Sequence, residues 1–584
     1  MSTVKSTEEA TRGVAPGGPG QLGRIRAWGL LLAGVLLMVF GVTVAAVVQR
    51  SGDVVVRDVR FAGADGTTFS GLLYVPRSAT TAAPAPAILA VHGYINTRET
   101  QSAFAIEFAR RGAVVLALDQ RGHGYSGGGA FTKGFGGPEG LAYLRGLPLV
   151  DRDQIGMEGH SMGGWAVLAA AAAYPRGYRS IVLEGSSVGP PFAAAGTPAW
   201  PRNLAVVFSR YDEFAPLMWG APRGGQVAES AKLRTLFGSA APVVAGRTYG
   251  DIAAGTARVF HNPPVTHAGD HISTAAVGHA IDWFAATLEG GSPRPASDQI
   301  WWWKEAATGA ALVGLFLFVL GAFDALLRLP AFAVLRATPV ASSTRRDVRW
   351  WGLLALTTLV PPLTFFPIDF VGPAPIPVSP VFPQQITNWL MVWALGNAAF
   401  ALILGRLLGR RSGGARPWRH ALLIAVATAG LAYAAVAAAS LALVDFRFWV
   451  VALKPLSASQ LVAALAYLAP FTLFTLVSFR GLAGLMVDAS ARRQFAVALA
   501  ALGLGFLVLT GGQYLYLFAT GTLPPGAQAL TVILAIQFVP ILAALAVLAV
   551  FAWRRTNSYL PGGLIAGLLV TWYMVAGTAT HYAG

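Results

Sequence analysis

Gly159-His160-Ser161-Met162-Gly163 places a serine between two glycines, each two positions away from it. Residues 154–158, before this stretch, carry apolar side chains at alternate positions, as a short strand does, and the alanine-rich residues 164–173 after it favour a helix. Glycine on both sides allows a strand to turn sharply into a helix, and such a turn exposes the serine hydroxyl. The stretch therefore predicts a strand, a tight turn and a helix, with Ser161 at the turn as a nucleophile.

Two glycine-containing loops follow apolar runs upstream of this serine. His92-Gly93-Tyr94 comes after residues 87–91, and the glycine-punctuated residues 119–126 come after residues 113–118. Glycine in the first loop allows the main chain to approach a bound substrate closely. The backbone N–H groups of Tyr94 and Met162 are predicted to form an oxyanion hole, in which each donor lowers the barrier by roughly 2.7 to 4 kcal/mol.

Taken together, the three motifs resemble the α/β-hydrolase family. Its members commonly carry H-G at the oxyanion loop, D-x-R-G-x-G-x-S after the next strand and G-x-S-x-G at the nucleophile, and all three occur here in the typical spacing. The resemblance covers about residues 51–293 and implies a mostly parallel sheet with flanking helices. It also implies a catalytic triad in the chain order serine, acid, histidine.

The acid of this triad is expected in a loop after a strand. Residues 203–208 are a buried-strand pattern that ends in Ser209-Arg210-Tyr211-Asp212, so Asp212 is the predicted acid. Glu213 is adjacent but is expected to point away from Asp212, and Glu184 occupies the position that some relatives use instead. An ordinary solvated loop carboxylate is the alternative interpretation of either glutamate.

Four histidines downstream are candidates for the base: His261, His267, His271 and His279. His267 lies in a loop with small neighbours ahead of the final helix, where relatives place this residue, and it is the predicted base. His271 is the second candidate, and His279 is expected to pack within an apolar helix. The histidines His92, His123 and His160 are expected to act as hydrogen-bonded scaffolding.

These residue types predict covalent catalysis. Ser161 alone is a weak nucleophile, so His267 must accept its proton while Asp212 orients the imidazole, and an acyl-enzyme results. No cofactor or metal is predicted. The chain has no cysteine, and the i, i+4 pair His267 and His271 lacks the intervening glutamate of a zinc motif.

The segment between residues 185 and 201 is too short for a large helical lid, so the pocket is expected to be open from above.

At 584 residues the chain exceeds one domain, and its composition changes after Trp301. Long apolar runs follow, and about 20 apolar residues suffice to cross the hydrocarbon core of a bilayer. We expect one transmembrane anchor before the hydrolase, at residues 28–48, and an all-α polytopic membrane domain over residues 301–584. The eight spans predicted in this domain are residues 305–326, 350–366, 388–408, 421–443, 460–479, 495–518, 528–552 and 561–579.

Arginine and lysine accumulate in loops on the cytoplasmic side of membrane proteins. Arginines concentrate here in alternate loops, at residues 328–349, 406–419, 480–493 and 554–555, and basic residues also occur in the tail, residues 1–27. The amino terminus is therefore predicted to be cytoplasmic, and the hydrolase domain, residues 51–293, to lie outside the cytoplasm at the cell membrane. The first span is expected to remain as an anchor, although a cleaved signal peptide is the alternative.

The net charge of +16 comes mostly from these loops, so nucleic-acid binding is not implied. Asp324 near one span end is expected to pair with Arg328, and Gly563 and Gly567 form a weak helix-contact motif. The predicted function is a membrane-embedded serine hydrolase that contacts lipids and cleaves small or lipid-like carboxylic esters. Peptidase and acyltransferase activities use the same triad, and a transporter or sensor with a gating hydrolase-like domain is the other alternative. Substrate identity and oligomeric state stay open.

Overall fold

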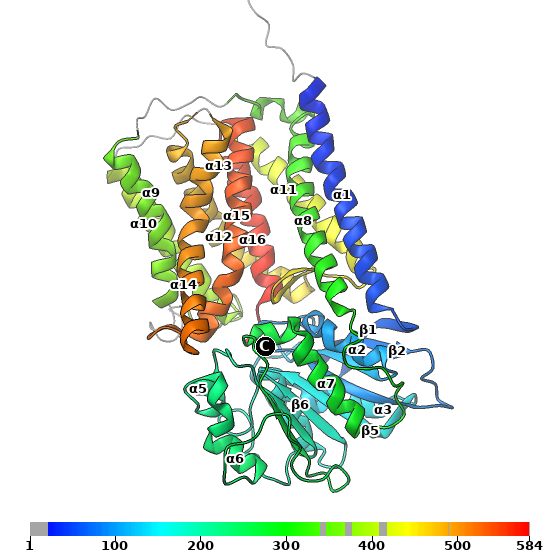
Figure 1. Ribbon diagram of the computed structural model, residues 1–584. Coiled ribbons are helices and arrows are strands. Elements are labelled where there is room, and N and C mark those ends of the chain that lie inside the picture. The colour runs from blue at the N-terminus through cyan, green and yellow to red at the C-terminus, as the bar shows by residue number, and fades with distance from the viewer. Residues whose placement is uncertain (1–20, 339–345, 368–375, 408–416, 489, 583–584) are drawn as a thin grey trace, which may run out of the picture.

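The computed structural model describes residues 21–338, 346–367, 376–407, 417–488 and 490–582. Residues 1–20 of the predicted cytoplasmic tail lie outside this part of the chain, as do residues 339–345 and 408–416 of two arginine-rich loops. The described residues form a sheet domain, residues 54–287, and a helical domain, made of the helix before it and the helices after residue 300. Figure 1 shows the helical domain as a bundle stacked on one end of the sheet domain.

The sheet domain is built on eight strands: β1 (Val54–Ala62), β2 (Thr68–Pro76), β3 (Ala85–Val91), β4 (Val114–Asp119), β5 (Val150–His160), β6 (Ser180–Glu184), β7 (Leu204–Val207) and β8 (Arg258–His261). Their order in the sheet is β1-β2-β4-β3-β5-β6-β7-β8. Only β2 runs antiparallel to its neighbours among these strands, and the remaining pairs are parallel. The mostly parallel sheet implied by the resemblance is confirmed.

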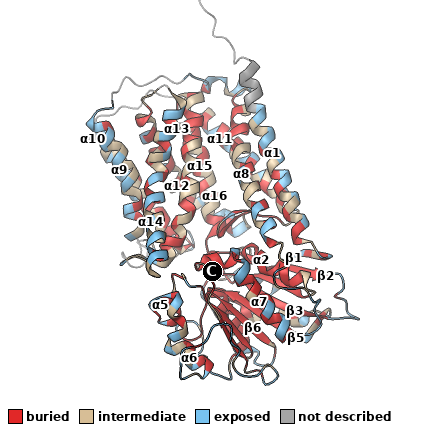
Figure 2. Cartoon of the chain, viewed as in Figure 1, coloured by how far each residue is buried: buried red, intermediate tan, exposed pale blue. Residues whose placement is uncertain are grey.

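Helices cover both faces of this sheet. α3 (Gly137–Gly146), α4 (Met162–Ala173) and α6 (Ala231–Phe237) pack on one face, and α2 (Ser102–Arg110) and α7 (Thr274–Thr287) pack on the other. The central strands are buried on both sides, which explains their continuous apolar runs (Figure 2). The remaining short elements are η1 (Arg98–Gln101), η2 (Lys133–Gly136), α5 (Ala215–Trp219), η3 (Gly224–Glu229) and η4 (Ala268–Ile272).

The helical domain contains α1 (Gln21–Gln49), α8 (Trp301–Leu326), η5 (Pro330–Leu335), α9 (Val348–Phe365), α10 (Gln385–Leu407), α11 (Trp418–Ser440), the short strands β9 (Phe446–Phe448) and β10 (Val451–Leu453), α12 (Ala458–Leu485), α13 (Ala491–Leu499), the π-helical turn η7 (Ala500–Leu504), α14 (Gly505–Thr520), α15 (Ala529–Thr556) and α16 (Leu560–Gly577). α13, η7 and α14 form one continuous helical segment. β9 and β10 pair as an antiparallel hairpin.

Eight helices in the described part of the chain are long and apolar enough to cross a membrane, and they indicate a multi-pass membrane protein. The sequence pattern predicts nine spans in total, the anchor included. α9, at the expected span of residues 350–366, is a helix but does not qualify, because Arg349, Pro361 and Pro362 dilute its apolar character. At the end of α8 the predicted pair of Asp324 and Arg328 forms at 3.0 Å.

The predicted anchor α1 packs along α8 as part of the bundle (Figure 1). A Cβ atom added at Gly34 would lie 2.5 Å from the backbone nitrogen of Phe318, so no larger residue fits without a shift of the helices. Small residues of this kind let two helix backbones approach closely in a membrane. The motif at Gly563 and Gly567 acts in the same way, because both glycines face α12.

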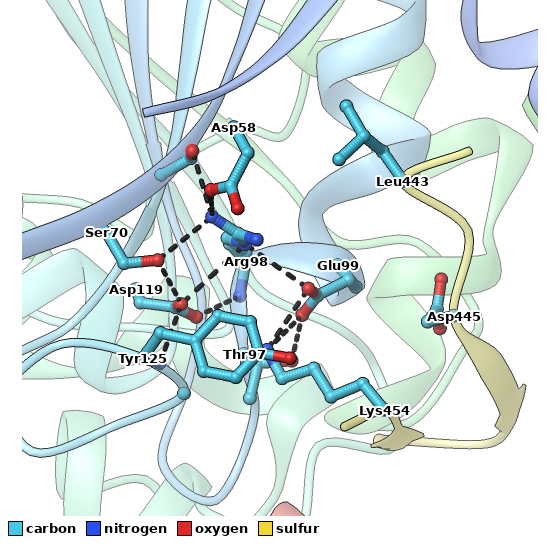
Figure 3. A network of polar contacts seen from close by, with 12 residues as sticks. Asp58, Ser70, Thr97, Arg98, Glu99, Asp119, Tyr125, Leu443, Asp445 and Lys454 are labelled. Carbon is cyan, nitrogen blue, oxygen red and sulfur yellow. Dashed lines mark hydrogen bonds and ion pairs between the residues drawn. The ribbon is translucent and has the colours of Figure 1, made fainter. Parts of the chain in front are cut away.

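A buried network of charged side chains joins the two domains (Figure 3). Lys454, which follows β10, pairs with Glu99 of η1 at 2.9 Å, and Glu99 also lies 3.2 Å from Arg98. Nearby, Lys304 of α8 pairs with Asp445 at 2.8 Å. Burial by itself would raise the pKa of Glu99, but Lys454 and Arg98 lower it well below its ordinary value. Glu99 is therefore held as a carboxylate between Lys454 and Arg98.

The helical domain covers the carboxyl ends of the parallel strands. Tyr125, in the loop after β4, donates to the carbonyl of Pro455 at 2.8 Å, and Gln460 of α12 donates to the carbonyl of Gly124 at 3.1 Å. The carboxyl ends of parallel strands are where α/β sheets place their ligand sites. The edge of the sheet that carries the candidate site thus faces the helical domain.

Candidate active site

Ser161 lies at the turn between β5 and α4, with φ 55° and ψ −120°. Positive φ is unusual for any residue other than glycine, and such strain is common at catalytic positions. The N–H of Ser161 donates to the carbonyl of Glu184 at 2.8 Å, which fixes the turn against β6. A Cβ at Gly163 would lie 2.0 Å from the carbonyl oxygen of Val91, so α4 can begin this close to β3 only with glycine there. The strand, turn and helix lie where the sequence places them.

His267 and Asp212 are brought together by two loops at the same edge of the sheet. The Nδ1–H of His267 donates to Asp212 Oδ2 at 2.9 Å, and Asp212 Oδ1 accepts the N–H of Phe214 at 2.7 Å. Burial by itself lowers the pKa of His267, but the charge and hydrogen bond of Asp212 outweigh it, and the net pKa is raised. Asp212 thus favours the protonated imidazole, the form that a base reaches after it accepts a proton.

The nucleophile and the base are neighbours through His160, which precedes Ser161. The Nε2 of His160 donates to the carbonyl of His267 at 2.8 Å, and the two rings lie 4.8 Å apart. No hydrogen bond between Ser161 and His267 occurs among the described residues. Such bonds often tighten only when substrate binds.

The other candidate histidines occupy different surroundings. His261 and His279 stack on each other with centroids 3.8 Å apart, and burial lowers the pKa of both. His271 is buried beside His160, and burial together with Arg447 lowers its pKa to about 3. His267 is the candidate that has a carboxylate partner on its ring and a raised pKa.

The alternative carboxylates also separate by their contacts. Glu184 is buried, its side-chain oxygens have no hydrogen-bond partner in the described part of the chain, and burial raises its pKa well above the ordinary value. Glu213 is not a solvated loop residue, because it is 8% exposed. Its Oε2 accepts the backbone N–H of His267 at 2.8 Å. Asp270, which the sequence pattern did not single out, is buried nearby and accepts a hydrogen bond from Ser209.

The predicted oxyanion donors lie on either side of the nucleophile. Met162 is the first residue of α4, so its N–H has no acceptor within the helix. A Cβ at Gly93 would lie 3.1 Å from the Cβ of Ser161, which shows how closely the loop that carries Tyr94 approaches the serine. His92 fixes this loop, because its Nε2 accepts the N–H of Gln120 at 3.1 Å. No group of three or more potential metal ligands occurs within the described ranges.

Two residues of the helical domain reach this site, and sequence reasoning missed both. Tyr514 of α14 donates to Glu213 Oε1 at 2.8 Å, and the Nε2 of His581, after α16, lies 2.7 Å from the hydroxyl of Tyr94. Both lie hundreds of positions from the site in sequence, and neither stands in a recognisable motif. Ser161 is 9% exposed and His267 is 5% exposed. The expectation of a pocket open from above is therefore wrong, because the helical domain takes the place of a lid.

Residues 86–267 match the family model described as alpha/beta hydrolase fold. This chain carries an α/β-hydrolase domain. A monoacylglycerol lipase of Mycolicibacterium smegmatis is 35% identical over 113 residues, which cover 18% of this chain and 39% of that relative. The match to this curated relative thus spans well under two thirds of its length.

One bacterial and one archaeal structure are among the solved structures that match part of this chain. A Pseudomonas aeruginosa protein described as hypothetical is 29% identical, with 23% of this chain and 43% of that chain covered and a TM-score of 0.21. The Pyrococcus furiosus esterase Pf2001 is 16% identical, with 41% of this chain and 95% of that chain covered and a TM-score of 0.30.

Proposed function

We propose that this protein is a membrane-embedded serine hydrolase that cleaves carboxylic esters through an acyl-enzyme. The observation that carries the proposal is Ser161 at a strained strand-to-helix turn, beside a histidine that Asp212 holds at 2.9 Å. His267 accepts the serine proton as the hydroxyl attacks the ester carbonyl, and the N–H groups of Tyr94 and Met162 hold the oxyanion. His267 then protonates the leaving alcohol, and it later activates the water that hydrolyses the acyl-enzyme.

The surroundings of Ser161 favour an apolar ester. Trp165, four residues along α4, stacks on Phe192 with centroids 4.4 Å apart. The ring centroid of Phe131 lies 5.6 Å from that of Phe192 and 5.0 Å from that of Tyr94. Aromatic rings of this kind bury apolar parts of a ligand and leave orientation to a few polar groups. The curated relative is named a monoacylglycerol lipase, which supports a lipid-like ester as the substrate of this chain.

The site lies at the edge of the sheet domain that packs against the helical domain. Tyr94, Ile95 and Ala268 belong to one apolar cluster with Val451 and Phe538 of the helical domain. This continuity suits a substrate that arrives from the membrane rather than from bulk water. We place the domain outside the cytoplasm, because the end of α8, the start of α13 and the end of α15, which border arginine-rich stretches of the sequence, lie at the far end of the bundle (Figure 1).

Ester hydrolysis by the purified full-length protein in detergent tests the proposal. The wild-type protein should hydrolyse p-nitrophenyl esters, and Ser161→Ala should lower kcat by more than roughly 10⁴-fold, because the nucleophile is lost. Ser239→Ala is the matched control, since this serine lies in a loop beyond α6 and its hydroxyl donates to the carbonyl of Ala241, far from the triad in the sheet domain. Hydrolysis that persists in Ser161→Ala would contradict the serine mechanism.

The orientation has its own test, which the absence of cysteine from the chain makes simple. Thr81→Cys introduces an exposed thiol on the sheet domain, and Arg492→Cys introduces one at the opposite end of the bundle. A membrane-impermeant maleimide should label Thr81→Cys in intact cells and Arg492→Cys only after the cells are permeabilised. The reverse pattern would place the hydrolase domain in the cytoplasm.

A further inference from the structure

Glu213 connects the candidate base to a helix of the membrane bundle. One carboxylate oxygen accepts the backbone N–H of His267 at 2.8 Å, and the other accepts the hydroxyl of Tyr514 at 2.8 Å. Glu213 is 8% exposed, so both oxygens depend on these protein donors. The main chain that carries the base is thereby tied to α14 through one buried carboxylate.

A second connection runs to the other side of Ser161. The Nε2 of His581 lies 2.7 Å from the hydroxyl of Tyr94, and its ring stacks on Phe131 with centroids 5.7 Å apart. Main-chain bonds of Thr580 to Gly122 at 2.7 Å and to Ala130 at 2.8 Å hold this segment on the sheet domain. Burial lowers the pKa of His581 to about 4 and raises the pKa of Tyr94. The hydroxyl of Tyr94 is therefore protonated and donates to a neutral imidazole.

We propose that Tyr514 and His581 of the helical domain are positioning residues for the catalytic site, Tyr514 through Glu213 on the base and His581 through Tyr94 on the oxyanion loop. The proposal rests on the serine hydrolase function proposed above. The helical domain then has a role in catalysis that a membrane anchor lacks. A misplaced base or oxyanion donor lowers kcat even when the protein is folded. Neither side chain is expected to touch the reacting atoms.

The charges around His267 allow the contact between Tyr514 and Glu213 to be tested through the pH dependence of activity. Asp212, Glu213 and Asp270 all raise the pKa of His267, and the rings of His160 and His271 are its titratable neighbours. Burial, followed by the charge of Asp212, raises the pKa of Glu213 to about 7, while His267 and the hydrogen bond from Tyr514 oppose this rise. Loss of the Tyr514 hydroxyl therefore leaves Glu213 more often neutral near pH 7, and His267 then loses part of the charge that raises its pKa.

Tyr514→Phe in the full-length protein tests this contact, with p-nitrophenyl acetate as the probe. The variant should lower kcat by roughly fivefold to tenfold with KM unchanged, as expected for one lost hydrogen bond to a buried charge. The acidic limb of the pH profile of kcat/KM should also move to lower pH. Glu213→Gln should move this limb in the same direction and further, because it removes the charge at every pH.

Tyr516→Phe is the matched control, because this tyrosine lies on the same helix, is 40% exposed and should leave both readouts unchanged. A purely structural role for Tyr514 would lower the amount of folded protein without moving the pH limb. The proposal is overturned if Tyr514→Phe and Glu213→Gln keep the wild-type pH profile. Inactivity of the wild-type protein would overturn the proposed serine hydrolase function itself. Failure of the function and failure of the positioning role therefore give different results.

His581 is tested by a pair of substitutions that differ in hydrogen-bonding ability. His581→Leu removes the acceptor and should lower kcat by roughly fivefold, whereas His581→Gln can still accept from Tyr94 and should retain most of the activity. Tyr94→Phe combined with His581→Leu should be no slower than the slower single variant, because both remove one bond. Equal activity of the leucine and glutamine variants, or additive losses in the double variant, would contradict this part of the proposal.

Discussion

The sheet domain meets the helical domain in two regions that differ in chemistry. At η1 the contact is a network of ion pairs, in which Lys454 pairs with Glu99 at 2.9 Å, and the adjoining helical elements hold the pair of Lys304 and Asp445 at 2.8 Å. At the candidate active site the polar contacts between side chains are single hydrogen bonds, from Tyr514 to Glu213 and between Tyr94 and His581. We infer that the first region holds the two domains together and that the second positions groups of the active site.

Energetics support this division. Removal of one partner from a buried ion pair leaves the other charge unpaired and costs about 3 to 5 kcal/mol, whereas one hydrogen bond typically contributes about 1 kcal/mol. A domain interface that relies on the network can therefore tolerate changes at the site. Substitutions in the two regions should accordingly affect different measurements.

The largest effect is expected inside the site, from Asp212→Asn. The amide cannot stabilise the charged imidazole of His267 and favours the wrong tautomer, so kcat should fall by roughly 10⁴-fold. The melting temperature should change little by comparison, because the shape of the side chain is kept. Steady-state kinetics beside thermal unfolding in detergent checks both halves of this expectation. A loss of less than tenfold would mean that another carboxylate, such as Asp270, serves His267.

The next largest effect is expected in the network, from Glu99→Gln. Lys454 and Arg98 would then lose their shared carboxylate in a buried position, and the free energy of unfolding should fall by about 3 to 5 kcal/mol. Glu289→Gln is the matched control, because Glu289 is 76% exposed and lies 3.5 Å from Arg179 at the surface, where such pairs contribute little. Lys454→Met added to Glu99→Gln should recover stability. No recovery of stability, or equal effects of the two glutamine variants, would show that the network does not hold the two domains together.

A change of pH should separate the two regions without any substitution. Activity needs neutral His267, whose pKa is raised above 6.5, so activity should decline as the pH falls through that raised value. The pKa of Glu99 is lowered well below 4.5, so its stabilising charge is present above pH 4.5 and is lost only as the pH falls through the lowered value. Between pH 6.5 and 4.5 the protein should be inactive but folded, and activity should return on neutralisation. Unfolding in this window would contradict the comparison.

Local motifs were sufficient to predict the fold of the sheet domain and the places of Ser161, Asp212 and His267. Each motif is set by nearby residues, as Gly163 shows, where only glycine allows α4 to begin close to β3. The contacts of Tyr514 and His581 depend instead on how distant helices pack, and no spacing in the sequence encodes that. The interpretation of Glu213 as a solvated carboxylate failed for this reason, because Glu213 is buried and accepts a hydrogen bond from Tyr514 of α14. The predicted span at residues 350–366 coincides with the helix α9, which contains Pro361 and Pro362, and its place in the membrane stays a prediction.

The central claim is that Ser161 is an activated nucleophile in a site that the helical domain completes. Labelling of the full-length protein with a fluorophosphonate probe tests it most directly, with Ser161→Ala, His267→Ala and Tyr514→Phe beside the wild type and the modified peptide identified by mass spectrometry. The account predicts labelling of Ser161 in the wild type, no labelling in the first two variants and slower labelling in the third. A folded wild-type protein that stays unlabelled, or a label on another residue, would contradict it.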